Sequence, residues 1–247
     1  MNIIYTLLNK ELIKLKRSII FYISIFFLFP LMLYLFYSIP LSLVFKDMKP
    51  IYMVWSSAGI WFLSSLFLTY LLSDLYINNY YNNESIRSFP ILSYHYLFSG
   101  YIYALFIGII ELIISIIIIS SITSYYISIT HFFKIIFIML PAIVMIYNTS
   151  FLINKISFQS FSKNISHILI FLILSFGVGS FIPLALFPES YMEVILYMPF
   201  ASTIYNVQNI ISNEPIFFSL LFSSIFYVII FTILNYFLIE NNIINRS

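Results

Sequence analysis

One acidic residue, Glu111, stands deep inside a long apolar stretch of this 247-residue sequence. An ionised carboxylate is costly in an apolar interior, so such a side chain is expected to face a helix bundle, a partner or water. Glu111 then either stays protonated and donates a hydrogen bond between helices, or takes part in handling a substrate. The residue pattern leaves both interpretations open.

Two further groups of small or polar residues interrupt apolar stretches. Asn148 and Thr149 could line a path for a substrate, so we count them, with Glu111, as candidate path residues. Small residues let helix backbones approach closely. The second group is therefore expected to pack helices within the chain or between subunits, and it consists of Gly177, Gly179 and Ser180.

Motifs for nucleotide, metal and hydrolase sites are absent from the sequence. There is no G-x-x-x-x-G-K-[ST] to hold phosphates, no H-E-x-x-H and no G-x-S-x-G. The three histidines lack a carboxylate at helical ligand spacing, and there is no cysteine. We expect no enzyme activity, metal or cofactor in this chain, no nucleic acid as a partner, and any ATP and Mg²⁺ on a separate protein.

The composition places these residues in a membrane. Hydrophobic residues make up 62% of the chain and charged residues 8%, and the mean hydropathy is +1.03. So few charges cannot cover a soluble protein of this size. A helix needs about 20 apolar residues to cross the hydrocarbon core. Six stretches qualify, at about 18–39, 52–72, 101–122, 132–153, 166–187 and 216–239.

The predicted fold class is an all-α integral membrane protein with a single transmembrane domain over residues 1–247. Barrel strands would need short alternating segments, and the run from Ile113 to Ile119 does not alternate. Pro30, Pro141 and Pro183 fall inside predicted spans and are expected to bend them. Asp74, at the end of the second span, is expected to be hydrated.

Lysine and arginine predict the orientation, because cytoplasmic loops carry the excess of positive charge. With the N-terminus inside, eight of the eleven basic residues are cytoplasmic and three are external, so both termini are expected in the cytoplasm. The external three are Lys46, Lys49 and Lys134, and the cytoplasmic eight are Lys10, Lys14, Lys16, Arg17, Arg87, Lys155, Lys163 and Arg246.

Three segments outside the predicted spans read as short helices. Residues 1–17 form an amphipathic pattern typical of an interfacial helix, either a simple anchor or a lever for a cytoplasmic partner. In the external loop 188–215, Ser190 to Glu193 fits a capping box, Pro199 is expected to end that helix, and a second short helix follows over 203–211. These two are expected on or in the outer leaflet.

The third segment lies in the long cytoplasmic loop after the second span. Its serine and proline favour a helical turn, and Gly100 is expected to separate it from the third span. It is either a short helix parallel to the membrane or an ordinary connector. It comprises Glu84, Ser85, Ile86, Arg87, Ser88, Phe89, Pro90, Ile91 and Leu92.

This order of elements resembles the membrane subunits of ABC-2 type exporters over essentially the whole chain. The best local match is Glu84 to Pro90, which looks like the family's glutamate followed by a serine-proline turn before span three. The family often has Gly-Thr after the glutamate and a lysine entering span three, where this chain has Ser85-Ile86 and Gly100-Tyr101.

The resemblance implies a permease subunit in the bacterial cell membrane that exports its substrate by alternating access. The segment from Glu84 to Leu92 would couple to a separate ABC ATPase dimer, which would hold ATP and Mg²⁺. A second copy or a similar permease would complete a path between the first and fifth spans. Within the family the chain looks most similar to lantibiotic-immunity and phenol-soluble-modulin exporters, so the substrate would be an amphipathic peptide.

Two other functions remain open. A membrane-embedded subunit of a vitamin importer also has about six spans and borrows an ATPase, although the long cytoplasmic loop argues against it. An intramembrane enzyme is disfavoured because Glu111 has no histidine or acidic partner at helical spacing.

Overall fold

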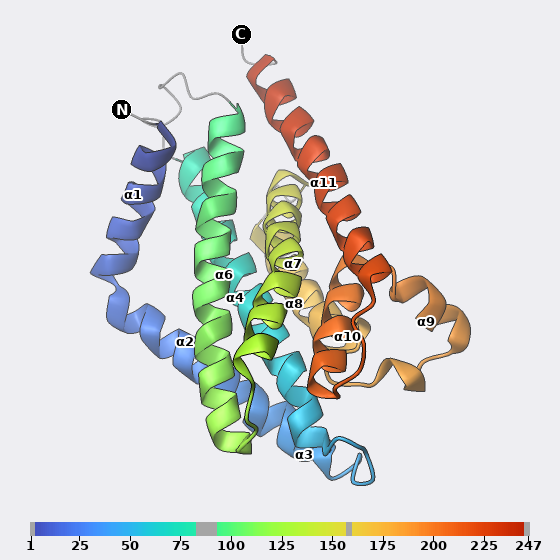
Figure 1. Cartoon of the computed structure of the whole chain (residues 1–247). Helices are drawn as coiled ribbons and strands as arrows, with labels where there is room; N and C mark the ends of the chain where they lie inside the picture. Colours follow the sequence, from blue (N-terminus) through green and yellow to red (C-terminus); the bar gives the residue numbers. More distant parts are fainter. Residues whose placement is uncertain (1–2, 83–92, 157–159, 245–247) are drawn as a thin grey trace.

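The computed structural model describes residues 3–82, 93–156 and 160–244 of the chain. These residues form helices joined by turns, with no strand among them (Figure 1). In chain order the elements are α1 (Ile3–Arg17), α2 (Ile19–Leu33), η1 (Tyr34–Ser38), α3 (Ile39–Ser42), α4 (Tyr52–Asn82), α6 (Ser93–Thr123), α7 (Ile129–Ile156), α8 (Ser160–Leu172), η2 (Ile173–Gly177), η3 (Leu184–Leu186), α9 (Glu189–Ile195), α10 (Pro199–Ile211) and α11 (Phe218–Ile244).

The chain is a multi-pass α-helical membrane protein. In the described part, five helices are long and apolar enough to cross a membrane. Each overlaps a span predicted from the sequence, and these five are Ile19–Ser42, Tyr52–Asn79, His95–Thr123, Ile129–Lys155 and Phe218–Leu238.

The spanning helices α4, α6, α7 and α11 are all longer than the predicted spans, α4 and α6 most of all. α4 and α6 each have 31 residues, or about 46 Å, whereas the hydrocarbon core is about 30 Å thick. Gly100 does not separate α6 from the preceding segment, because α6 runs through it. A side chain at that position would overlap the ring of Tyr147, so glycine lets α6 and α7 pack closely.

The fifth predicted span, 166–187, is not one helix. α8 begins earlier, at Ser160, and continues only through the π-helical turn η2 to Gly177. Gly179 has φ +87°, a conformation that suits glycine, and Pro183 lies outside any helix. The backbone therefore turns where the prediction required a continuous helix, and α8 with η2 is a short apolar helix of residues 162–177.

Prolines at the other two predicted bends lie inside helices. α2 continues through Pro30 and opens into the wider π turn η1 at Tyr34, and α7 continues through Pro141. A proline removes one backbone donor and crowds the preceding turn, so a π turn beside it is a common accommodation.

α4 is the centre of the bundle. Within its most apolar window 83% of the residues are buried, against 22% for the spans of α2 and α11, which flank the bundle (Figure 1). Small residues allow this packing, because a Cβ at Gly59 would overlap the carbonyl group of Ser180 in the segment after η2. The faces of α2 and α11 that are exposed in the monomer are apolar and suit lipid.

Helix α1 is present where residues 1–17 predicted it. It meets α2 at an elbow between Arg17 and Ile19 and packs beside α6, and it ends with a basic turn. α1 begins and α11 ends at the same end of the bundle (Figure 1). The position of α1 at a membrane surface and the cytoplasmic location of this end stay predictions.

The loop before α11 differs from the prediction in detail. Ser190 is not an N-cap, because α9 already begins at Glu189 after Pro188, and Pro199 starts α10 instead of ending α9. Proline suits the first position of a helix, where no intrahelical donor is needed. α10 is buried along most of its length between α4, α7 and α11. It is an inserted element of the core and not a surface helix.

Candidate functional site

A hydrogen-bonded group of polar side chains joins α6, α7 and α11 inside the bundle. The hydroxyl of Tyr101 donates to Asn148 Oδ1 at 2.8 Å, and Asn235 Nδ2 donates to the same oxygen at 2.7 Å. Thr232 Oγ1 lies 3.3 Å from Asn148 Nδ2 and 3.1 Å from the hydroxyl of Tyr101. We call Tyr101, Asn148, Thr232 and Asn235 the Asn148 network.

An apolar groove of about 450 Å³ lies beside this network, between α6 and α11. Tyr101 and Thr232 belong to both, and with Tyr236 they are the three hydroxyl-bearing side chains of an otherwise apolar lining. Such a surface suits an amphipathic chain more than a polar metabolite. The remaining lining residues are Leu97, Phe98, Ile233 and Phe237.

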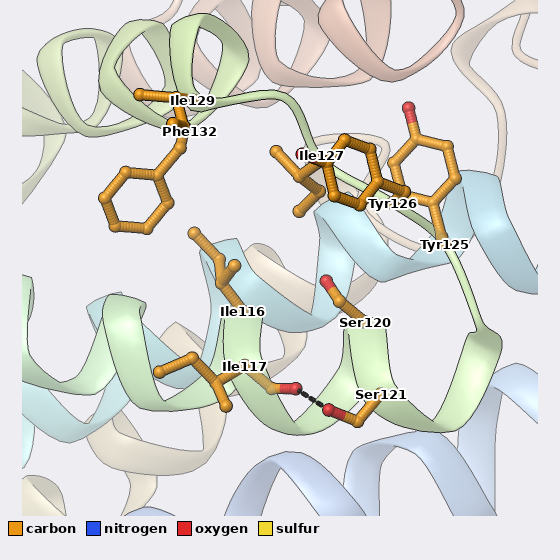
Figure 2. Close-up of a pocket in the computed structure, with 9 residues that line it drawn as sticks. All are labelled: Ile116, Ile117, Ser120, Ser121, Tyr125, Tyr126, Ile127, Ile129 and Phe132. Atoms are coloured by element: carbon orange, nitrogen blue, oxygen red, sulfur yellow. Dashed lines mark hydrogen bonds between the residues drawn. The ribbon is translucent and has the colours of Figure 1, made fainter.

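Two other hollows are open at the surface of the spans. One, of about 280 Å³, lies where α6, α7 and α11 meet around Pro141 and is almost wholly apolar. The other, of about 400 Å³, lies at the turn between α6 and α7. Figure 2 shows its lining, with Ile116 and Phe132 on one side and Tyr126 on the other. The hydroxyl of Ser121 donates a hydrogen bond to Ile117 O at 2.7 Å.

A second polar group holds α8 against α4 and α7. Asp74 Oδ1 lies 2.7 Å from Lys163 Nζ, and Asn154 Nδ2 donates to the same oxygen at 2.6 Å. Lys163 also donates to Asn154 Oδ1 at 2.8 Å. His167 Nε2 lies 3.9 Å from Asp74 Oδ2, and its Nδ1 is 3.0 Å from the hydroxyl of Tyr70. We call these five residues the Asp74 cluster.

The expectation of a hydrated Asp74 is wrong. This residue is 5% exposed, and its carboxylate has a lysine and two amide donors, the second being Asn78 at 3.0 Å. Positive charge and hydrogen bonds from the protein replace the hydration of this buried carboxylate. Asn78 is four residues away on α4, but Asn154 and Lys163 come from α7 and α8, far away in the sequence, so the local pattern around Asp74 could not reveal them.

Glu111 is fully buried in the middle of α6. Neither carboxyl oxygen has a hydrogen-bond partner among the described residues. It shares a buried face of α6 with Ala104, Gly108 and Ser115, where α4 and α7 meet. The apolar residues around Glu111 in the sequence already favoured this interior position.

The structure does not bring the candidate path residues together. α6 and α7 pack with Tyr101 against Asn148 and Gly108 against Ile143, so Glu111 lies farther along the bundle from Asn148. Thr149 is half-buried and donates to Ile146 O in its own helix at 2.8 Å, outside the Asn148 network. A path that uses all three stays a prediction.

The three small residues after α8 serve different contacts. Ser180 packs its carbonyl group against Gly59, and the carbonyl group of Gly179 accepts from Gln208 Nε2 of α10 at 2.8 Å. Gly177 lies in open space, where an added Cβ would meet only its neighbour Ile173, and its carbonyl group accepts from Tyr191 at 2.8 Å. Their role in contacts between subunits stays a prediction.

The coupling segment from Glu84 to Leu92 lies outside the described residues. In the described part no group of three or more histidine, aspartate or glutamate side chains could hold a metal ion.

Lys10 on α1 has a pKa below its ordinary value, chiefly because it is partly buried and also because Lys14 is near.

Sequence reasoning missed Tyr101, Thr232 and Asn235 of the Asn148 network. The available signal was the pair Thr232 and Asn235 in the last span, since residues three apart share a helix face. Lys163 and His167 carried the same kind of signal in α8, since residues four apart share a helix face.

Comparison of the chain with protein-family models, characterised proteins and solved structures finds no significant match. The fold thus defines a class, multi-pass α-helical membrane proteins, and the contacts within it are the basis for any functional conclusion.

Proposed function

We propose that this chain is the membrane-spanning subunit of an ATP-driven exporter of the ABC-2 type, which moves amphipathic peptides out of the cell membrane or cytoplasm. The observation that carries the proposal is the buried α10, which directly precedes the last span and follows the short α9. Together with the N-terminal α1 it matches the element order of that family. In this proposal the chain crosses the membrane between α7 and α9 by way of α8, η2 and the turn after them.

The groove between α6 and α11 supports the choice of substrate. It opens sideways between spans, so a molecule dissolved in the bilayer could enter it without passing through water. Its apolar lining would take the apolar face of a peptide.

In the proposed transport path through the groove between α6 and α11, α10 forms the barrier on the outer side. It lies toward the end of the bundle away from the termini (Figure 1) and packs against α4, α7 and α11. In an alternating-access cycle the groove would be open toward the inner side while α10 closes the outer side. ATP binding to a partner ATPase dimer at the cytoplasmic end would act through the segment from Glu84 to Leu92. It would close the groove on the inner side and open the barrier at α10 on the outer side.

Copurification tests the proposal. The wild-type chain and its Phe89→Asp variant, which puts a charge into the expected contact, are each purified from native membranes and probed for a bound ABC ATPase. The matched control is Tyr126→Asp, because Tyr126 is 84% exposed at the turn between α6 and α7. Wild type and control should retain the ATPase, and Phe89→Asp should lose it.

The other candidate functions give different outcomes. A separate membrane scaffold that copurifies along with the ATPase would favour the importer subunit. Turnover of a substrate by the purified chain alone would favour an intramembrane enzyme. Absence of any ATPase from the wild-type preparation would contradict the proposal.

A further inference from the structure

α4 carries a stripe of polar side chains inside the bundle. Trp61, Ser65, Thr69 and Ser73 follow each other at intervals of four residues, so they share one face of the helix. All four are fully buried. We call them the α4 polar stripe, and its last member is the residue before Asp74, at the end of the bundle where the Asp74 cluster lies.

This stripe faces Gly108 and Glu111 of α6. Ser65 Oγ donates to Gly108 O at 2.8 Å, and a Cβ at Gly108 would lie 2.9 Å from Thr69 Oγ1. Tyr76 on α4 pairs with Ser99 on α6, so the two helices are antiparallel. In this register Glu111, one turn beyond Gly108, lies at the level of the Trp61 end of the stripe.

Several polar atoms along this seam have no hydrogen-bond partner in the described part of the chain. They are Trp61 Nε1, Thr69 Oγ1, Ser73 Oγ and both carboxyl oxygens of Glu111. Buried polar groups are seldom left unpaired, and a polar seam with several such groups is a place for ordered water. A row of donors that leads to a carboxyl group is the arrangement that proton transfer requires.

Within the described part of the chain, no charged side chain compensates Glu111. The ion pairs of the described residues join Glu11 to Lys14 and Asp74 to Lys163 and His167. On α4 the nearest charge, Asp74, is about 20 Å along the helix from Trp61. On α7, Lys134 is exposed and Lys155 lies in the last turn. Tyrosines also face α6 from its neighbours, Tyr76 on α4, Tyr147 on α7 and Tyr22 on α2, and they lie at the level of Tyr101 and Tyr103, nearer the Asp74 end.

We propose that Glu111 is a proton-binding site, and that water held by the α4 polar stripe exchanges its proton with the solution at the Asp74 end of the bundle. A proton from a hydronium ion adds to the carboxylate and leaves neutral water, and release reverses this step with no change of oxidation state. The inference goes beyond the proposed exporter because it needs no ATPase. It adds a protonation step that could accompany any conformational change of α4 against α6.

Infrared spectroscopy of the purified chain in lipid nanodiscs tests this inference. At neutral pH the wild type should show the carbonyl band of a protonated carboxyl group, and Glu111→Gln should remove it. Glu111→Asp keeps a carboxyl group and should shift the band, which protects the test if the glutamine variant misfolds. Transfer into D₂O should shift the wild-type band as the proton exchanges.

The rate of that exchange tests the route. Thr69→Val removes one hydroxyl from the stripe with little change of shape and should slow exchange by about tenfold. Thr123→Val removes a hydroxyl that donates within α6 to Ile119 O at 2.8 Å and should leave the rate unchanged. An ionised Glu111, a band that does not exchange, or equal rates in the two valine variants would overturn the inference, whether or not an ATPase copurifies.

Discussion

The ammonium group of Lys163 on α8 lies 2.7 Å from the carboxylate of Asp74 on α4. These side chains are 17% and 7% exposed, so the pair is mostly shielded from water. α8 presents exposed apolar residues on its other side, among them Ile168 and Leu169. The Asp74 cluster is therefore the specific polar attachment of this short helix to the bundle.

Breaking this ion pair should loosen α8. Lys163→Met leaves the buried carboxylate without its main partner, so we expect the free energy of unfolding to fall by about 3 kcal/mol. Reversible unfolding in mixed detergent micelles measures this. Lys134→Gln removes an exposed lysine from α7 and should change stability by less than about 0.5 kcal/mol. Equal effects of the two changes would show that the pair contributes nothing specific.

The Asn148 network should stabilise the contact between α7 and α11. Asn148→Leu removes the acceptor shared by Tyr101 and Asn235 and should lower the free energy of unfolding by about 1 kcal/mol, the usual size for a hydrogen bond between membrane helices. Thr149→Val, in the same turn but outside the network, is the control. A larger loss for Thr149→Val would contradict the assignment of the network.

Two glycines should respond oppositely to alanine. Gly59→Ala puts a methyl group against the carbonyl group of Ser180, so we expect a loss of about 1–3 kcal/mol from overpacking. Gly177→Ala enters open space beside Ile173 and should be neutral or slightly stabilising. The same unfolding assay compares them, and a neutral Gly59→Ala would mean that α4 and the segment around Ser180 are not in close contact.

The fold was predictable wherever a single apolar run decides the structure. Five of the predicted spans overlap helices long enough to cross a membrane, because a run of about 20 apolar residues has few alternatives in lipid. The prediction of one continuous span over 166–187 was wrong, because hydropathy counts Gly177, Gly179 and Pro183 as part of an apolar stretch although the backbone turns among them.

The polar sites were only partly predictable. Glu111 and Asn148 could be chosen because each interrupts an apolar stretch. The partners of Asn148 and, apart from Asn78, those of Asp74 come from other helices, up to 89 positions away in the case of Lys163, so only the packed structure pairs them. Likewise, amphipathic spacing indicated a helix over 203–211 but not that its polar face would also be buried, as Asn206 and Gln208 are.

Side-specific labelling tests the orientation. The native chain has no cysteine, so Tyr197→Cys, at an exposed position between α9 and α10, gives a single reactive thiol. We expect a membrane-impermeant maleimide to label it from outside intact cells, and to label Tyr5→Cys only after the cells are opened. Labelling of both positions from the same side would contradict cytoplasmic termini and an external α9.

The most direct test of the central claim is ATP-dependent uptake of a fluorescent amphipathic peptide into inside-out proteoliposomes that contain this chain and its ATPase. The account predicts uptake by the wild type. It predicts strong loss for Ile233→Trp, which fills the groove between α6 and α11, and full activity for Phe222→Trp, at a residue of α11 that is 69% exposed and outside the groove. Absence of ATP-dependent uptake by the wild type, or equal uptake by the two tryptophan variants, would contradict transport through this groove.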